Sequence, residues 1–385
     1  MADLISVPDI RHTLPPHAPL RLAINGYGRI GRCFLRALYE AGLEDRLQVV
    51  AINEPAHLDS IIYLTRFDST HGRFPGEVSG TLTAGEVSGA FTAGEVSGAL
   101  TAGEVAPCDG GFSINGRPIA VSHATTPEAV NWGAHGIDLL AECSGQYGER
   151  AGIERFLNAG VPRVLLSHPA QSAADVDATV VFGLNQDKLD GRERIVSNAS
   201  CTTNAVVPVL DLLERELGLE RVLLTTLHSV MNDQPLIDGY HHADLRRTRS
   251  AMQSIIPVAT GLARGVERLL PQLHGKVTAK AIRVPTTNVS AIDMVLTLSR
   301  PADAADINRL IANAAASAAC RKRLDYTEAA HASIDFNHAP HSAIVDGSQT
   351  RNISPSTVNL FLWFDNEWGF ANRMLDVTQH WQARW

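Results

Sequence analysis

A glycine-rich turn between a β-prone segment and an amphipathic helical pattern constrains the fold more than any other part of the sequence. Residues 21–25 are β-prone and end at glycine, and residues 29–41 then carry apolar side chains at helical spacing. Residues 47–52 form a continuous apolar run, which is typical of a parallel strand covered on both faces. Strand, helix and strand in this order predict a βαβ unit with a right-handed crossover.

The turn at 26–31 reads Gly-Tyr-Gly-Arg-Ile-Gly, which is the G-x-G-x-x-G pattern. In this setting the glycines let the backbone approach a pyrophosphate, whose charge the helix N-terminus stabilises. Glu54 falls at the end of the second strand, where a carboxylate accepts hydrogen bonds from the adenosine ribose and repels a 2′-phosphate. We therefore predict an NAD site in preference to an NADP site. The alternative is a plain glycine turn beside a solvated glutamate, which the βαβ setting disfavours.

Composition excludes several other classes of protein. With 385 residues, of which 45% are hydrophobic and 19% charged, the chain is long enough for two or three domains and too apolar to be disordered. Its 33 basic and 41 acidic residues give a net charge of −8, which disfavours nucleic-acid binding. Five widely spaced cysteines without a C-x-x-C pair argue against a disulfide framework and a structural zinc site. Without an apolar run for a signal peptide or a membrane span, we expect a cytoplasmic protein that does not bind a membrane.

A nine-residue repeat interrupts the alternation of strand and helix signals. Residues 76–105 hold three copies, GEVSGTLTA, GEVSGAFTA and GEVSGALTA, and the start of a fourth. An odd period would turn the apolar side chains of successive copies to opposite faces of a straight strand. The period is also far shorter than that of stacked repeat proteins. We interpret the segment as a duplicated surface hairpin or loop without chemistry, and the alternative is a partner-binding arm.

The segment 197–204 reads SNASCTTN and precedes an apolar helical pattern. Cys201 therefore falls at or beside a helix N-terminus, where the helix dipole is expected to lower a thiol pKa. An isolated cysteine is more often a buried, inert thiol. His228 lies in the strand pattern that follows, and helix-turn-strand geometry returns the chain beside its start, so a Cys201–His228 pair with histidine as base can form. The alternative is that His228 is an ordinary core histidine.

Eight strings follow one another in the order seen in the phosphorylating glyceraldehyde-3-phosphate dehydrogenase family: NGYGRIGR, AINE, STHGRF, SNASCTTN, HSVMNDQ, IIPVATG, RVPTTNV and DNEWGFANR. The chain resembles this family from about residue 21 to its C-terminus, with the repeat as an interruption. The Pro- and His-containing segment at 1–20 is expected to be a disordered tail. For the rest of the chain the resemblance implies an α/β fold: a Rossmann NAD-binding domain at 21–200, an α+β catalytic domain with a largely antiparallel sheet at 201–365, and a C-terminal helix at 366–385 that returns to the NAD-binding domain. It also implies a homotetramer.

The resemblance further implies roles for individual residues. Cys201 would attack a phosphorylated aldose at its aldehyde, His228 would take the proton, and hydride transfer to the nicotinamide would leave a thioester. Cofactor contacts are expected from Gly26, Gly28, Arg29, Ile30, Gly31, Glu54, Ser167 and Asn366. Substrate contacts are expected from Ser200, Thr202, Asp233, Thr260, Gly261 and Arg283, among which Arg283 suits a phosphate because its planar fork meets two oxygens at once.

Within the family, the sequence is most similar to the D-erythrose-4-phosphate dehydrogenase branch, through Glu54, Met231, LSHPA around His168 and DFNHAPHSAIVDGSQTR near the C-terminus. Met231 cannot donate the hydroxyl hydrogen bond that a threonine gives the substrate phosphate in the glycolytic branch, which favours water over inorganic phosphate in resolving the thioester. Because Asn232 is more like the glycolytic branch, a phosphorylating glyceraldehyde-3-phosphate dehydrogenase is the alternative. A non-catalytic, regulatory NAD-binding protein is a third reading, which the intact set of Cys201, His228 and Arg283 disfavours.

Overall fold

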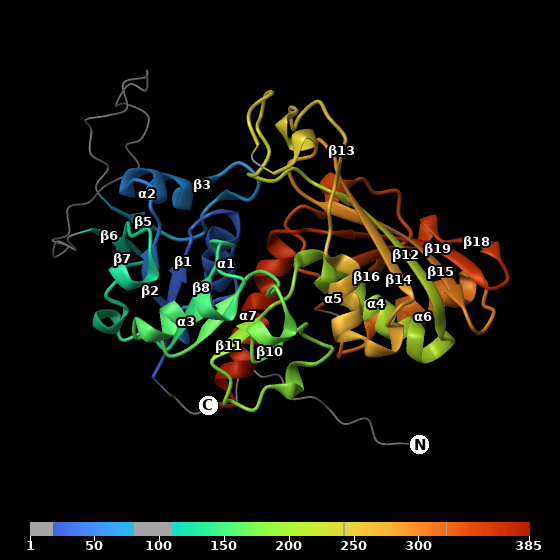
Figure 1. Ribbon diagram of the computed structural model, residues 1–385, viewed down its shortest axis with the longest axis horizontal. Helices are drawn as coiled ribbons and strands as arrows, with labels where there is room; N and C mark the ends of the chain where they lie inside the picture. The colour runs from blue at the N-terminus through green and yellow to red at the C-terminus, as the bar shows by residue number, and fades with distance from the viewer. Residues whose placement is uncertain (1–17, 81–109, 242, 321) are drawn as a thin grey trace.

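The computed structural model describes residues 18–80, 110–241, 243–320 and 322–385. The predicted tail at 1–20 and the repeat at 76–105 lie almost entirely outside the described residues. Within these ranges, two sheets with separate hydrophobic cores lie on either side of a long C-terminal helix, α7 (Trp368–Gln382), which is red in Figure 1.

The first sheet is a Rossmann sheet, as the βαβ signal predicts. Its strands run in the order β10-β11-β9-β8-β1-β2-β7-β6-β5, and every pair is parallel except β7 with β6 and β6 with β5. The strand bounds are β1 Leu20–Asn25, β2 Leu47–Asn53, β5 Val78–Ser79, β6 Gly111–Ile114, β7 Arg117–Ser122, β8 Leu139–Glu142, β9 Val164–Leu166, β10 Ala178–Thr179 and β11 Ile195–Ser197.

Three helices and a small hairpin complete this part: α1 (Arg29–Glu40), α2 (Leu58–Arg66), α3 (Arg150–Asn158), and β3 (Phe67–Asp68) paired with β4 (Gly72–Arg73). The apolar stripe predicted for 29–41 is buried on α1, with Phe34 and Leu38 fully inaccessible. That stripe packs into the same core as β1 and α7, which explains why a helix forms at this position.

The second sheet is mixed and largely antiparallel. Its order is β13-β14-β12-β15-β19-β17-β16, with β18 beside β19, and only the pairs β12–β14 and β16–β17 are parallel. The strand bounds are β12 Leu219–His228, β13 Ile256–Val258, β14 Val277–Arg283, β15 Ser290–Leu298, β16 Leu324–Thr327, β17 Ala343–Asp346, β18 Arg351–Ser354 and β19 Thr357–Phe364. Helices α4 (Cys201–Leu217), α5 (Leu262–Leu269) and α6 (Ala304–Ala316) contribute to the same core. The predicted fold class is therefore confirmed.

The connection from β11 into α4 places the start of the second domain against the first. Cys201 is the first residue of α4 and packs against both cores, one of which contains β1 and α7 and the other α4 and β12. The glycine turn opens at the carboxyl end of β1, where open α/β sheets bind their ligands. The two sequence motifs therefore lie where the two domains meet.

Candidate active site

The glycine turn is shaped by close contacts at its ends and is open in the middle. Gly26 has a φ of +84°, and a Cβ there would lie 2.5 Å from the backbone nitrogen of Ser144. A Cβ on Gly31 would lie 2.4 Å from the carbonyl oxygen of Gly26, so neither glycine can carry a side chain. Within the described part of the chain, no atom lies within 4 Å of the position a Cβ on Gly28 would take, and no side chain caps the first turn of α1. Open space and uncapped N–H groups fit a pyrophosphate, to which Arg29 and Ile30 would contribute their backbones.

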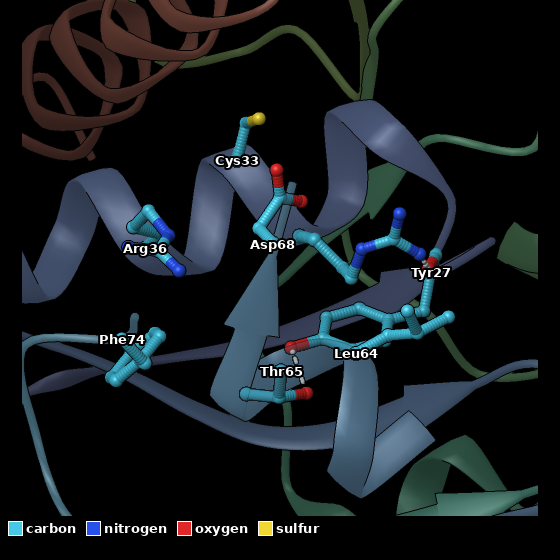
Figure 2. Close-up of a pocket in the computed structure, with 8 residues that line it drawn as sticks. Tyr27, Cys33, Arg36, Leu64, Thr65, Asp68 and Phe74 are labelled. Carbon is cyan, nitrogen blue, oxygen red and sulfur yellow. Dashed lines mark hydrogen bonds between the residues drawn. The ribbon is translucent and has the colours of Figure 1, made fainter. Parts of the chain in front are cut away.

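Glu54 lies directly after β2 and reaches the glycine turn. Its Oε2 accepts the backbone N–H of Tyr27 at 2.7 Å, and its Oε1 accepts that of Ala56 at 3.2 Å. The buried Tyr27 hydroxyl lies 3.0 Å from the hydroxyl of Thr65, and Figure 2 shows both lining a pocket with room for about one water. The side chain of Tyr27 thus anchors the glycine turn to Thr65 of α2. The half-buried Glu54 carboxylate lies at the end of β2, in a position suited to a ribose.

A buried carboxylate that the sequence analysis did not predict lies next to the glycine turn. Glu142 ends β8; its Oε2 accepts the side-chain amide of Asn25 at 2.5 Å, and its Oε1 accepts the N–H of Ser144 at 2.8 Å. Burial raises its pKa above the usual value, although these hydrogen bonds oppose the shift. Ser167, a predicted cofactor contact, donates its N–H to the Glu142 carbonyl at 2.9 Å and so lies at the same strand ends. An acidic residue closing an apolar strand was the signal that could have revealed Glu142.

The side chain of Arg29 turns away from the open face of the glycine turn. Its Nε donates to Glu367 at 2.8 Å, and its guanidinium also binds Asp68. His71 continues the set, with Nε2 3.1 Å from Glu367 and Nδ1 2.9 Å from Nδ1 of His338. We call Arg29, Asp68, His71, His338 and Glu367 the junction cluster, because its members come from both domains. Cys33, His71 and Glu367 hold possible metal ligand atoms within 4.8 Å of one another. The Glu367 carboxylate, however, is already paired with Arg29, which disfavours a metal ion at this position.

The structure brings the predicted nucleophile and base together. Cys201 begins α4, and the side chain of Ser200 caps that helix by accepting the N–H of Thr203 at 3.1 Å. The Cys201 Sγ lies 3.7 Å from Nε2 of His228, the last residue of β12. The other ring nitrogen of His228 faces the carbonyl oxygen of Ser229 at 2.8 Å, so Nδ1 carries the proton and Nε2 is free to accept one from the thiol.

The expectation that the helix dipole lowers the pKa of Cys201 is wrong for this structure. Burial raises the pKa of the thiol to about 11, which outweighs the opposing effects of Arg283 and the backbone N–H groups of Thr202 and Cys201. Burial likewise lowers the pKa of His228 to about 4. Both groups are therefore neutral near pH 7, and a thiolate arises by proton transfer from Sγ to Nε2 rather than by ionisation in advance.

A cationic region lies beside this pair. Arg283 ends β14 and is paired in register with His228, and its buried Nε has no hydrogen-bond partner among the residues that the structure describes. Its pKa is lowered, chiefly by burial, as expected for a cation without a bound anion. Asp233, which was predicted as a substrate contact beside Arg283, binds Arg247 at 2.7 Å. Arg247 was missed in the sequence, where it is one of several arginines in DLRRTR and nothing local distinguishes it.

The predicted hydroxyl-bearing residues gather at the starts of two neighbouring helices. The Ser200 hydroxyl lies 3.0 Å from that of Thr202, at the start of α4. The Thr260 hydroxyl accepts the N–H of Leu262, the first residue of α5, at 3.1 Å, and Gly261 precedes that helix directly. Helices α4 and α5 pack against each other, but among the described residues no hydrogen bond joins Thr260 or Gly261 to Arg283. The arrangement is one of hydroxyls and helix N-termini, which suits an anion.

Asn366 completes the site from the C-terminal segment. Its Oδ1 accepts the hydroxyls of Ser229 at 3.0 Å and of Ser290 at 2.8 Å, and Ser229 is the neighbour of His228. Because both hydroxyls hold the oxygen, the amide is oriented with Nδ2 as its remaining donor. A carboxamide carbonyl such as that of nicotinamide is a suitable acceptor for this group.

An open glycine turn on a Rossmann sheet, joined to a second domain that supplies a Cys–His pair, defines an NAD-dependent oxidoreductase. Two models of one family match the chain: glyceraldehyde 3-phosphate dehydrogenase, NAD binding domain, over residues 20–94, and glyceraldehyde 3-phosphate dehydrogenase, C-terminal domain, over residues 200–366. Together they cover more than half of the chain, which therefore belongs to the glyceraldehyde 3-phosphate dehydrogenase family. It is an NAD-dependent aldehyde dehydrogenase of a family that acts on phosphorylated aldoses. None of the helices in the described ranges is long and apolar enough to cross a membrane.

Proposed function

We propose that this chain oxidises D-erythrose 4-phosphate to 4-phosphoerythronate through a thioester on Cys201, in the cytoplasm and as a step toward pyridoxal phosphate. The observation that carries the chemistry is a distance of 3.7 Å between the Sγ of Cys201, at the start of α4, and the unprotonated Nε2 of His228, at the end of β12. The sequence resemblance to the erythrose-4-phosphate branch, which includes Met231 two residues before Asp233, supports the substrate.

The residues present allow a balanced sequence of steps. His228 Nε2 accepts the thiol proton as Sγ bonds to the aldehyde carbon, and it returns that proton to the carbonyl oxygen to give a thiohemiacetal. NAD, when bound, supplies the acceptor for the hydride that leaves this carbon. His228 then takes the hydroxyl proton and a thioester results. After His228 releases that proton to solvent, it accepts one from the attacking water. It returns this proton to the sulfur as the C–S bond breaks, which gives the carboxylic acid and the free thiol.

Recognition of the substrate phosphate falls to Arg283, with Arg247 nearby. Arg283 keeps an unpartnered, buried Nε, and Arg247 is held by Asp233 in the same region. Met231 is 45% exposed and carries no donor, so it leaves one hydrogen bond of an anion site unmade. A weaker site for inorganic phosphate supports water as the group that resolves the thioester.

A phosphorylating glyceraldehyde-3-phosphate dehydrogenase is the second candidate. Asn232 and the hydroxyls at the starts of α4 and α5, from Ser200, Thr202 and Thr260, favour it because they suit a second anion.

The two functions separate in one assay. NADH formation from D-erythrose 4-phosphate and from D-glyceraldehyde 3-phosphate is measured with and without inorganic phosphate, and the product is tested with hydroxylamine, which traps an acyl phosphate but not a carboxylate. We expect higher kcat/KM for the tetrose and no requirement for phosphate. A strict phosphate requirement with preference for the triose would overturn the proposal. Met231→Thr is the matched variant, in which phosphate should stimulate the reaction more than in the wild type.

We also propose a homotetramer. The described residues between β12 and β13 include several large exposed apolar side chains that no described residue covers: Leu236, Ile237, Tyr240, Leu245 and Ile255. An exposed apolar loop of this size is typical of a surface that another chain buries. Light scattering on the purified protein should give four times the chain mass, and a monomer over the micromolar range would contradict it.

A further inference from the structure

The turn that leads into α4 holds a strained residue two positions before the proposed nucleophile. Ala199 has a φ of +57°, in the left-handed region that residues with a Cβ seldom adopt, and it is buried. Such a conformation persists only where surrounding contacts impose it, and it is often found at functional sites. The direction in which Cys201 leaves this turn therefore depends on whatever holds Ala199.

Asn204, one turn into α4, holds the carbonyl groups on both sides of Ala199. Its Nδ2 donates to the carbonyl oxygen of Asn198 at 2.7 Å and to that of Ser200 at 3.0 Å. One amide group thus spans the strained residue. The other support comes from Ser197, whose hydroxyl accepts the N–H of Ala199 at 3.1 Å and donates to the carbonyl of His168 at 2.8 Å.

Burying the Asn204 side chain is unfavourable, which indicates that the hydrogen bonds donated by its Nδ2 are the reason for an asparagine at this position. Asn204 is almost fully buried in the apolar first turns of α4, between residues such as Ala205 and Val207. Its Oδ1 is buried without a hydrogen-bond partner, which is unfavourable. An apolar residue would avoid that penalty, so packing alone does not account for an asparagine here.

We propose that Asn204 is a positioning residue: its amide fixes the left-handed turn at Ala199 and thereby holds the Cys201 Sγ against Nε2 of His228. This inference rests on the proposed role of Cys201 as nucleophile. The amide donates to the backbone that precedes the thiol, at the carbonyls of Asn198 and Ser200. Without the amide, the turn relaxes toward ordinary φ values and the sulfur moves away from the base.

The test compares Asn204→Ala with Asn308→Ala. Asn308, in α6, also uses its side-chain amide to hold a backbone carbonyl, that of Gly347 at 2.9 Å, but lies outside the site. Asn204→Ala should lower kcat and the rate of Cys201 alkylation by iodoacetamide, followed by intact mass at pH 7, each by about tenfold or more. The affinity for NAD and the KM should change by less than about twofold. Asn308→Ala should lower only the melting temperature.

A glycine at 199 separates positioning from general stability. Because glycine adopts positive φ without strain, Ala199→Gly removes the need for the amide. In the Asn204→Ala background it should restore both alkylation and kcat to within about threefold of the wild type, and in the Asn308→Ala background it should restore nothing. Should Asn204→Ala fail to fold, the double variant with Ala199→Gly carries the same test.

Two results would overturn the inference. One is alkylation and kcat in Asn204→Ala within about twofold of the wild type. The other is a folded double variant that remains as slow as Asn204→Ala. Failure of the proposed function is seen separately, because a Cys201→Ala variant that still forms NADH would remove Cys201 from the mechanism whatever Asn204 does.

Discussion

Two polar centres lie near the junction of the domains. The groups of one are neutral, and the carboxylates of the other are ionised. At the Cys201–His228 pair, burial raises the pKa of the thiol to about 11 and lowers that of the imidazole to about 4, so both are neutral near pH 7. In the junction cluster, burial would also raise the pKa values of Asp68 and Glu367. Hydrogen bonds from Arg29, and from His71 to Glu367, instead hold both below their usual range. A counter-charge within hydrogen-bond distance, rather than burial itself, decides the outcome.

This difference matches what each centre does. The proposed reaction needs a proton to leave the sulfur as the sulfur bonds to the aldehyde carbon, and a neutral imidazole can accept that proton. The junction cluster has the opposite requirement, because a permanent ion pair between Arg29 and Glu367 ties the glycine turn to the residue after Asn366, and these two segments form the proposed cofactor site. Placing Arg283 near the thiol without a hydrogen bond to it leaves the first centre neutral but responsive to a bound anion.

Removing the sulfur should have the largest effect of any single change. Cys201→Ala is expected to lower kcat/KM by about 10⁴-fold or more, because the covalent step is lost. The NAD affinity, measured by titration calorimetry, should stay near the wild-type value. An active Cys201→Ala enzyme would mean that the neutral pair has another purpose.

Removing the base tests whether the pair is neutral in the resting enzyme. His228→Gln should lower kcat by about 10² to 10⁴-fold near neutral pH, because no group then accepts the thiol proton. Since the thiol pKa is about 11, solvent ionises a growing fraction of it as the pH rises, and the difference from wild type should narrow. The pH profile of Cys201 alkylation in both proteins measures this. A constant ratio across the alkaline range would show a thiol that is already ionised.

Removing the Arg29 charge should favour neutral carboxyl groups in the junction cluster, as burial favours neutral groups at the Cys201–His228 pair. Arg29→Met leaves two buried carboxylates without their cation and should lower the free energy of unfolding by about 3–5 kcal/mol near pH 7. Groups whose folded pKa is depressed contribute stability above their unfolded pKa, and that contribution is lost as pH falls through the folded values. The difference from wild type should therefore shrink in acid, below about pH 4.

The matched control for Arg29 is Arg155→Met. Arg155 binds Glu128 through two hydrogen bonds, but both side chains are largely exposed. Urea unfolding should show little change for this variant. Adding Asp68→Asn and Glu367→Gln to Arg29→Met should recover part of the lost stability, and a double carboxamide that recovers none would contradict an electrostatic cause.

The sequence predicted the elements and the residues of the site better than their electrostatic states. The stripe of α1, the parallel strand at 47–52 and the return of His228 beside Cys201 all depend on local periodicity and short connections, which a sequence carries directly. The thiol pKa was predicted in the wrong direction because the helix dipole is a local feature, whereas burial comes from two cores assembled from distant segments.

Side-chain partners across long sequence separations were equally hard to foresee. Arg29 looks like a cofactor residue in its motif, yet its guanidinium binds Glu367, 338 residues away. Arg247 stands among several arginines, and only the fold selects it by placing Asp233 beside it. Asn204 belongs to a recognisable motif, but its contacts with the turn at Ala199 require the backbone geometry.

Glu142 is intermediate between the neutral pair and the junction cluster, and its substitution should have the smallest effect on the free energy of unfolding. It is more completely buried than the junction carboxylates, but its partners are the neutral groups of Asn25 and Ser144, and burial raises its pKa. A group with a raised folded pKa contributes stability below its unfolded pKa that is lost as pH rises through the folded value. Glu142→Gln should cost about 1–2 kcal/mol at acid pH, since its amide N–H₂ faces the donor of Asn25.

The cost of Glu142→Gln should therefore decrease as the pH rises above about 4.5, because only the wild type loses stability there. Urea unfolding across this range measures it, with the exposed Glu149→Gln following the wild type at every pH. A cost that grew with pH would mean that Glu142 is stabilised as an anion. A hidden counter-charge would then act on it, and the contrast between neutral and ion-paired centres would not hold.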